Sequence, residues 1–101
     1  MIIRLSPQRR DDPLQVVRSG DLLIVNGASF DFSVMGDGDT LPASAIKSEW
    51  FAGDIDKEGG ELALTLWLPN PWNYSPAQAF PVPLVDVPNG AVVFPDPLPA
   101  D

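Results

Sequence analysis

Alternation of hydrophobic and polar positions dominates the first two thirds of the chain and predicts β-structure. Between residues 61 and 68 leucine occupies every second position, and Trp67 is the largest of the residues between them. Because a strand sends successive side chains to opposite faces, the leucine row predicts a core-facing strand near the centre of a sheet. The position of Trp67 on the other face indicates that this second face is also covered.

Asn26-Gly27 is the strongest turn signal, because both positions of a tight hairpin turn favour residues that tolerate positive φ. It follows an apolar run at residues 21–25 and precedes an alternating run at residues 29–34. In the second run two phenylalanines and Val34 are expected to share one buried face. This segment is therefore predicted to be a half-buried antiparallel strand.

The remaining elements of the first two thirds are short. They are a strand at residues 1–5 that stops at Ser6-Pro7, a hairpin of residues 14–18 and 21–25 joined through Ser19-Gly20, and a hairpin with arms at 50–56 and 61–68 joined through residues 58–60. Thr40 is a candidate cap for a helical turn at residues 41–46, with Pro42 early in that turn. The predicted fold is mainly β: a small antiparallel sheet, or a β-sandwich or barrel of hairpins, with one or two short helical turns.

The last third differs in composition, since residues 69–101 hold nine of the twelve prolines and no Lys or Arg. Proline fixes φ and lacks a backbone donor, which excludes ordinary helices and central strands. Ser75-Pro76 predicts a short helix start, and Pro88-Asn89-Gly90 predicts a turn that joins residues 84–87 to 91–94 as a hairpin. We therefore divide the single domain into an antiparallel β-domain at 1–68 and an extended proline-rich arm at 69–101.

The arm carries too much apolar surface for a solvated linker, so it is expected to pack on the β-domain, on a partner, or on both. Aromatic side chains between prolines are stiff and lose little entropy when they dock, which suits interface anchors. The candidate partner-binding residues are Trp67, Trp72, Tyr74, Phe80 and Phe94. The alternative is that Trp72 and Tyr74 cover the second face of the sheet.

Charge and composition narrow the possible functions. The 101 residues include no cysteine and no histidine, which excludes Ser-His-Asp and Cys-His catalysis, and the net charge is −8. A field of that sign repels nucleic acid and anionic membranes, and the longest apolar run, residues 22–25, is far short of the roughly 20 needed to span a bilayer. The first residues lack a signal-peptide pattern, so synthesis in a cytoplasm is expected.

The polar clusters indicate no catalytic, cofactor-binding or metal-binding residue, and we expect a protein that is not an enzyme. Asp37-Gly38-Asp39 suggests calcium, but an EF-hand loop would need oxygen ligands where Leu41 and Ser48 stand. Asp54 and Asp56 could work as paired carboxylates, but a solvated strand face explains them as well. In residues 9–12 two arginines precede two aspartates, which favours a local ion-paired loop.

Three strings carry a resemblance to a known family. They are Gly36-Asp37-Gly38-Asp39-Thr40-Leu41-Pro42, Ser48-Glu49-Trp50-Phe51-Ala52-Gly53-Asp54 and Leu68-Pro69-Asn70-Pro71-Trp72-Asn73-Tyr74-Ser75-Pro76. With them, the chain resembles small acidic proteins encoded in the tail-gene cluster of long-tailed bacteriophages, including Mu-like phages. The resemblance implies a tail-tip or baseplate component of the virion, with other tail proteins, or further copies of itself, as partners. It carries over no functional residue.

Three other functions remain open from the sequence. A tail-fibre assembly chaperone would bind the fibre transiently and be absent from the finished particle. An acidic inhibitor would bind a basic host protein that itself binds nucleic acid. A carbohydrate-binding module would use Trp67, Trp72 and Tyr74 to stack on sugars.

Overall fold

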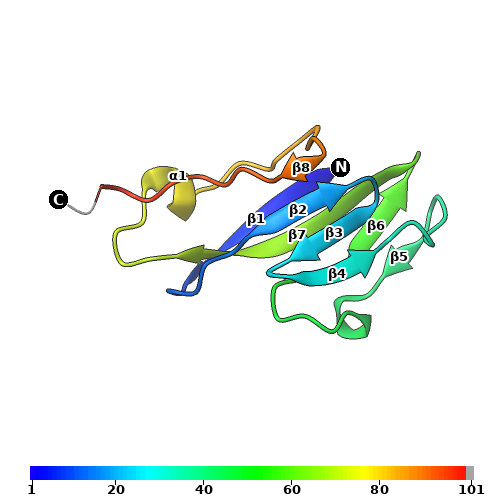
Figure 1. The fold of residues 1–101 in the computed structure, drawn as a ribbon, viewed down its shortest axis with the longest axis horizontal. Coiled ribbons are helices and arrows are strands. Elements are labelled where there is room, and N and C mark those ends of the chain that lie inside the picture. Colours follow the sequence, from blue (N-terminus) through cyan, green and yellow to red (C-terminus); the bar gives the residue numbers. More distant parts are fainter. Residues whose placement is uncertain (100–101) are drawn as a thin grey trace.

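A computed structural model describes residues 1–99 and arranges them as two four-stranded sheets around one core (Figure 1). The strands are β1 (Ile2–Arg9), β2 (Val16–Ser19), β3 (Leu22–Val25), β4 (Ala28–Asp31), β5 (Thr40–Leu41), β6 (Ile55–Glu58), β7 (Glu61–Asn70) and β8 (Gly90–Ala91). The helical elements are a 3-10 turn, η1 (Ala43–Ala45), and one turn of α-helix, α1 (Pro76–Ala79). The predicted mainly β fold class is confirmed.

The strand order is β1-β7-β6-β5 in the first sheet and β4-β3-β2-β8 in the second. Both sheets contribute to the same hydrophobic core: Leu64 and Ile3 come from the first sheet, and Leu23 and Val25 from the second. Phe51 adds to this core through edge-to-face contacts with Phe30 and Phe32, at ring-centroid distances of 5.2 and 6.0 Å. The core therefore lies between the two sheets.

Strand β7 bears out the alternation of its sequence. Its four leucines, at positions 62, 64, 66 and 68, are each at most 2% exposed. Trp67 on the opposite face is half-buried and packs against the core cluster. With β1 on one side and β6 on the other, β7 lies inside its sheet.

Strand β1 is longer than predicted and continues through Ser6-Pro7 to Arg9. It also pairs with β7 in parallel, whereas an antiparallel arrangement was expected. Pro7 is tolerated because alternate residues of a strand direct their backbone groups to opposite sides. The amide and carbonyl of Ile3 bond Leu84, on the side of β1 that faces away from β7. Pro7 lies four residues further along and therefore faces the same side. The amide hydrogen that proline lacks would point away from β7, so the pairing with β7 loses no hydrogen bond.

The predicted hairpins of the β-domain form with short connections. Asn26 and Gly27 have φ values of 47° and 85° and link β3 to β4, whose last pair is Val25 with Ala28. Gly59 and Gly60 separate β6 from β7 in the same way. The first arm of this second hairpin is interrupted, because Ala52 bonds the Thr65 carbonyl while regular pairing resumes only at β6.

The predicted strand at residues 29–34 is wrong at its end, since β4 stops at Asp31. The Asp31 carboxylate accepts a hydrogen bond from the Ser33 amide at 2.9 Å, and the Met35 amide bonds the Phe32 carbonyl at 3.1 Å. This turn breaks the alternation, so Val34 is 87% exposed and Met35 takes the buried position.

The helical turn predicted at residues 41–46 is shorter and has a different start. Thr40 is not its cap, because its hydroxyl donates to the Asp56 carboxylate at 2.6 Å and thereby joins β5 to β6. The 3-10 turn η1 begins after Pro42 without a side-chain cap. The Asp54 carboxylate, from the segment before β6, accepts a hydrogen bond from the Ala43 amide at 3.0 Å and so stabilises the start of this turn.

The arm runs along the β-domain as two extended limbs, residues 80–88 and 90–97, which lie side by side above β1 (Figure 1). The hairpin predicted between residues 84–87 and 91–94 is wrong. Leu84 instead pairs with Ile3 of β1, and Gly90–Ala91 forms β8 against β2. Within the limbs, the amides of Leu84 and Val92 donate to the carbonyls of Ile3 in β1 and Val16 in β2, so each limb is bonded to the edge of one sheet.

Candidate interaction surface

The arm begins at Asn70, a residue that is 5% exposed and ends β7. Its carbonyl accepts hydrogen bonds from the Arg10 amide at 2.9 Å and from the Arg9 guanidinium at 3.4 Å. Its side-chain amide donates to the Gln78 carbonyl at 2.9 Å. Asn70 is therefore bonded both to the end of β1 and to helix α1, and these bonds fix the direction in which the arm leaves the sheet.

Helix α1 reverses the arm and has the predicted N-cap. The Ser75 hydroxyl accepts from the Gln78 amide, and the Gln78 side chain accepts from the Ser75 amide, which together form a capping box. The Ser75 hydroxyl also donates to the Asp96 carbonyl at 2.7 Å. Asn73 adds two bonds to the backbone of Leu98, at 2.6 and 2.9 Å. The start and the end of the arm are thus tied together.

One face of the arm completes the core. Val87 is 4% exposed and belongs to the core cluster, against which Leu84, Val92 and Phe94 pack. Three backbone hydrogen bonds of 2.8–2.9 Å hold this face: two join Leu84 with Ile3, and one runs from the Val92 amide to the Val16 carbonyl. The limbs therefore close the gap between the edges of the two sheets.

The other face of the arm is apolar but points outward. Phe80 is 84% exposed, Val82 75%, Val85 62% and Val93 82%. Monomeric proteins usually bury such side chains, and contiguous exposed apolar surface is typical of interaction sites. These four residues form what we call the outer face of the arm.

A groove of about 370 Å³ lies on this surface between the two limbs. Every residue that lines it is apolar: Ala77, Phe80, Pro81, Val82, Leu84, Val93, Phe94 and Pro95. A second apolar hollow, of about 260 Å³, shares Leu84 and Val93 with it and continues along the limbs towards β8. We call the larger hollow the arm groove.

The predicted partner-binding residues divide into three groups. Trp67 packs against the core, Phe80 and Phe94 line the arm groove, with Phe94 also packed against the core, and Trp72 and Tyr74 lie in the loop before α1 at 70% and 49% exposure. The exposure of Trp72 and Tyr74 contradicts the alternative that they cover the second face of the sheet. Because Trp67 is packed against the core, it does not join these two in a single exposed platform for sugars.

Sequence reasoning missed the valines of the outer face. Val82, Val85 and Val93 occur among prolines, where a regular alternation cannot be assumed. The signal that could have revealed them is the absence of any charged residue from 79 to 85 and from 87 to 95, which leaves few polar side chains to face solvent.

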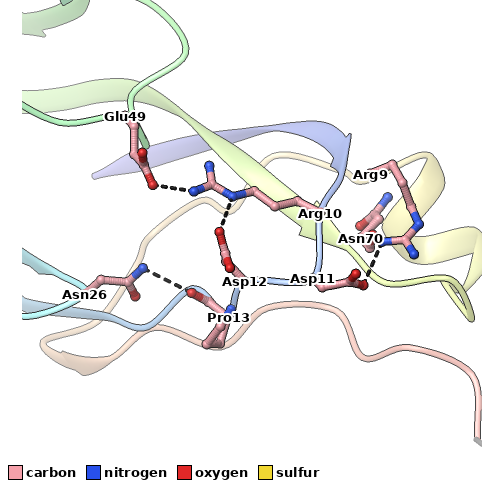
Figure 2. Close-up of polar contacts among 8 residues, drawn as sticks. All are labelled: Arg9, Arg10, Asp11, Asp12, Pro13, Asn26, Glu49 and Asn70. Atoms are coloured by element: carbon pink, nitrogen blue, oxygen red, sulfur yellow. Dashed lines mark hydrogen bonds and ion pairs between the residues drawn. The ribbon is translucent and has the colours of Figure 1, made fainter.

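The predicted ion-paired loop forms at the C-terminal end of β1, beside Asn70 (Figure 2). The Arg9 guanidinium pairs with Asp11 at 2.7 Å, and the Arg10 guanidinium pairs with Asp12 at 2.8 Å and also with Glu49. The Arg10 guanidinium also lies 4.1 Å from the centre of the Trp50 ring, a cation–π contact. Hydrogen bonds to Asp12, and secondly to Glu49, raise the pKa of Arg10. Arg10 therefore ties this loop to the segment before β6.

The carboxylates of Asp37 and Asp39 accept hydrogen bonds from backbone amides. The Asp37 carboxylate accepts from the Gly60 amide and the Asp39 carboxylate from the Gly36 amide, both at 2.7 Å. Such bonds stabilise turns and use the oxygens that a calcium site would need. Across residues 1–99, no three Asp or Glu side chains gather as ligands for a metal ion, and no helix there is long and apolar enough to cross a membrane.

No protein-family model, curated protein or solved structure matches this chain.

Proposed function

We propose that the protein is a non-enzymatic structural component of a phage tail, at the tail tip or baseplate, which binds a neighbouring tail protein through the outer face of its arm. One observation carries this proposal. The arm is hydrogen-bonded into both sheets on one side, yet it displays Phe80, Val82, Val85 and Val93 to solvent on the other. A rigid apolar surface of this kind loses little conformational entropy when a partner covers it. The resemblance of the three sequence strings to phage tail-gene products supplies the setting.

Trp72 and Tyr74 extend the proposed contact to the end of the molecule. Their loop is held by the bonds between Asn73 and Leu98, so the two rings are presented by a fixed backbone. Aromatic residues of this kind are common among the few residues that dominate binding energy. In this proposal they are secondary anchors in the loop before α1.

Quantitative mass spectrometry of purified phage particles tests the proposal. A structural component is expected in a fixed ratio to the major tail proteins. A variant with Phe80→Asp should be expressed and folded but depleted from particles, whereas the control Val34→Asp, which alters another exposed hydrophobic residue, should be retained. Expression during infection without incorporation into particles would overturn the structural role and favour the assembly chaperone.

A further inference from the structure

The charged residues of the arm itself are all acidic. The groove itself has only apolar lining. Asp96 follows the lining residue Pro95, and Asp86 follows Val85 on the first limb; both aspartates are exposed. No Lys or Arg occurs between residues 69 and 101. A segment that docks here therefore meets an apolar hollow on an arm whose described charged side chains are the carboxylates of Asp86 and Asp96.

A second copy of this chain is a poor occupant. Each copy has a net charge of −8, so two copies repel each other over distances comparable with the Debye length. Most of the chain's own cations are already engaged: Arg9, Arg10 and Lys57 form ion pairs. Arg18 donates to the carbonyls of Gly20 and Val87.

The remaining cations are badly placed for such a contact. Arg4 lines a polar hollow together with Asp56, Glu58 and Glu61, where three carboxylates surround it. Among residues 1–99 this leaves Lys47 as the one cation for which no ion pair, no side-chain hydrogen bond and no carboxylate-lined hollow is found. A second copy thus has no basic segment to set beside an apolar anchor.

We propose that the arm groove binds a segment of a different protein in which an aromatic or branched aliphatic side chain is flanked by Lys or Arg. The apolar side chain fills the space between Phe80 and Val93, and the basic residues face Asp86 and Asp96. The inference rests on the proposed function in one respect, namely that the outer face of the arm serves a partner. It goes further by stating the chemistry of that partner.

Selection from a random-peptide display library on the immobilised full chain tests this inference. Enriched peptides are expected to combine an aromatic or branched aliphatic residue with Lys or Arg beside it. A synthetic peptide of the enriched sequence should bind the full chain about tenfold or more weakly after Phe80→Asp or Val93→Asp, because hot-spot contacts are lost. The matched control Val34→Asp should leave its affinity unchanged.

Salt dependence tests the electrostatic part. Raising the salt from about 0.05 to about 0.5 M should weaken binding several-fold, because exposed charges are screened. The double variant Asp86→Asn with Asp96→Asn should lose most of this dependence while the apolar contact remains. A salt dependence that is unchanged in the double variant would overturn the assignment of these two aspartates.

Three results would overturn the inference as a whole: enrichment of peptides without basic residues, failure to enrich any peptide, or self-association of the purified chain that Phe80→Asp abolishes. None of them depends on the particle experiment. Presence in phage particles together with selection of uncharged peptides would retain the proposed function and remove this inference. Absence from particles together with selection of basic-flanked peptides would do the reverse.

Discussion

Replacing Val87 with alanine is expected to destabilise the protein, although Val87 lies in the proline-rich arm. Its side chain is 4% exposed and belongs to the core cluster. The change removes the equivalent of two buried methylene groups at about 0.8 kcal/mol each, and the residual cavity adds to this. The free energy of unfolding should therefore fall by about 2 kcal/mol, which corresponds to a decrease in Tm of roughly 8–15 °C for a domain of this size.

Val85→Ala is the matched control, because Val85 lies two residues away in the same limb and is 62% exposed. This variant should stay within about 0.5 kcal/mol of the parent, as most surface substitutions do. Urea unfolding followed by tryptophan fluorescence gives both values, with equal slopes expected for all three proteins. If Val87→Ala and Val85→Ala were equally harmless, the arm would not complete the core and the reasoning would be refuted.

Further substitutions test the β-domain. Leu64→Asp places a charge within the leucine row and should prevent folding; a normal melt by circular dichroism would show that the central strand is wrongly assigned. Gly27→Ala forces a side chain into the left-handed region at φ +85° and should lower the free energy of unfolding by about 1–2 kcal/mol. Its control is Gly53→Ala, which has open space around the added methyl group and should lower the free energy of unfolding by less than about 0.5 kcal/mol in the same urea assay. Arg10→Ala should lower the Tm more than Arg9→Ala, because Arg10 holds the segment before β6 through Glu49 and the Trp50 ring, whereas Arg9 reaches beyond its own loop only through a 3.4 Å bond to the Asn70 carbonyl; an equal decrease would argue against the link made by Arg10.

Local patterns account for what could be predicted of the β-domain. The leucine row of β7 and the Asn26-Gly27 turn depend on neighbours in the sequence, so the alternation and the turn residues were sufficient. The end of β4 was missed for a local reason too. The Asp31 carboxylate accepts a hydrogen bond from the Ser33 amide, and the chain turns before Val34. The alternation of hydrophobic and polar residues does not predict this turn.

The arm was predictable in composition but not in pairing. Leu84 pairs with β1 and Gly90–Ala91 with β2, strands more than sixty residues away, and no local signal specifies these partners. The alternation rule also fails within it. Val85 and Val87 would share one face of a regular strand, but Asp86 has a φ of 51°, so one valine points outward and the other into the core.

The candidate interaction surface was also predicted only in part. Phe80 was predicted from its place between prolines, and it does lie on the outer face. Phe94 packs against the core and also lines the arm groove, whereas Trp67 packs against the core and does not line the groove. Which aromatic side chain remains exposed depends on how the arm packs on the two sheets, and the order of residue types along the chain does not specify that packing.

Site-specific photo-cross-linking tests most directly whether the outer face of the arm contacts a partner. A photoreactive phenylalanine analogue would replace Phe80 in the full chain during phage production, and the same analogue at Val34 would serve as the control. In purified particles we expect the analogue at position 80 to give one dominant cross-link to a tail protein whose linked segment carries Lys or Arg, and the analogue at position 34 to give none. Particles that contain the protein but show no cross-link from position 80, or equal cross-linking from both positions, would contradict the account.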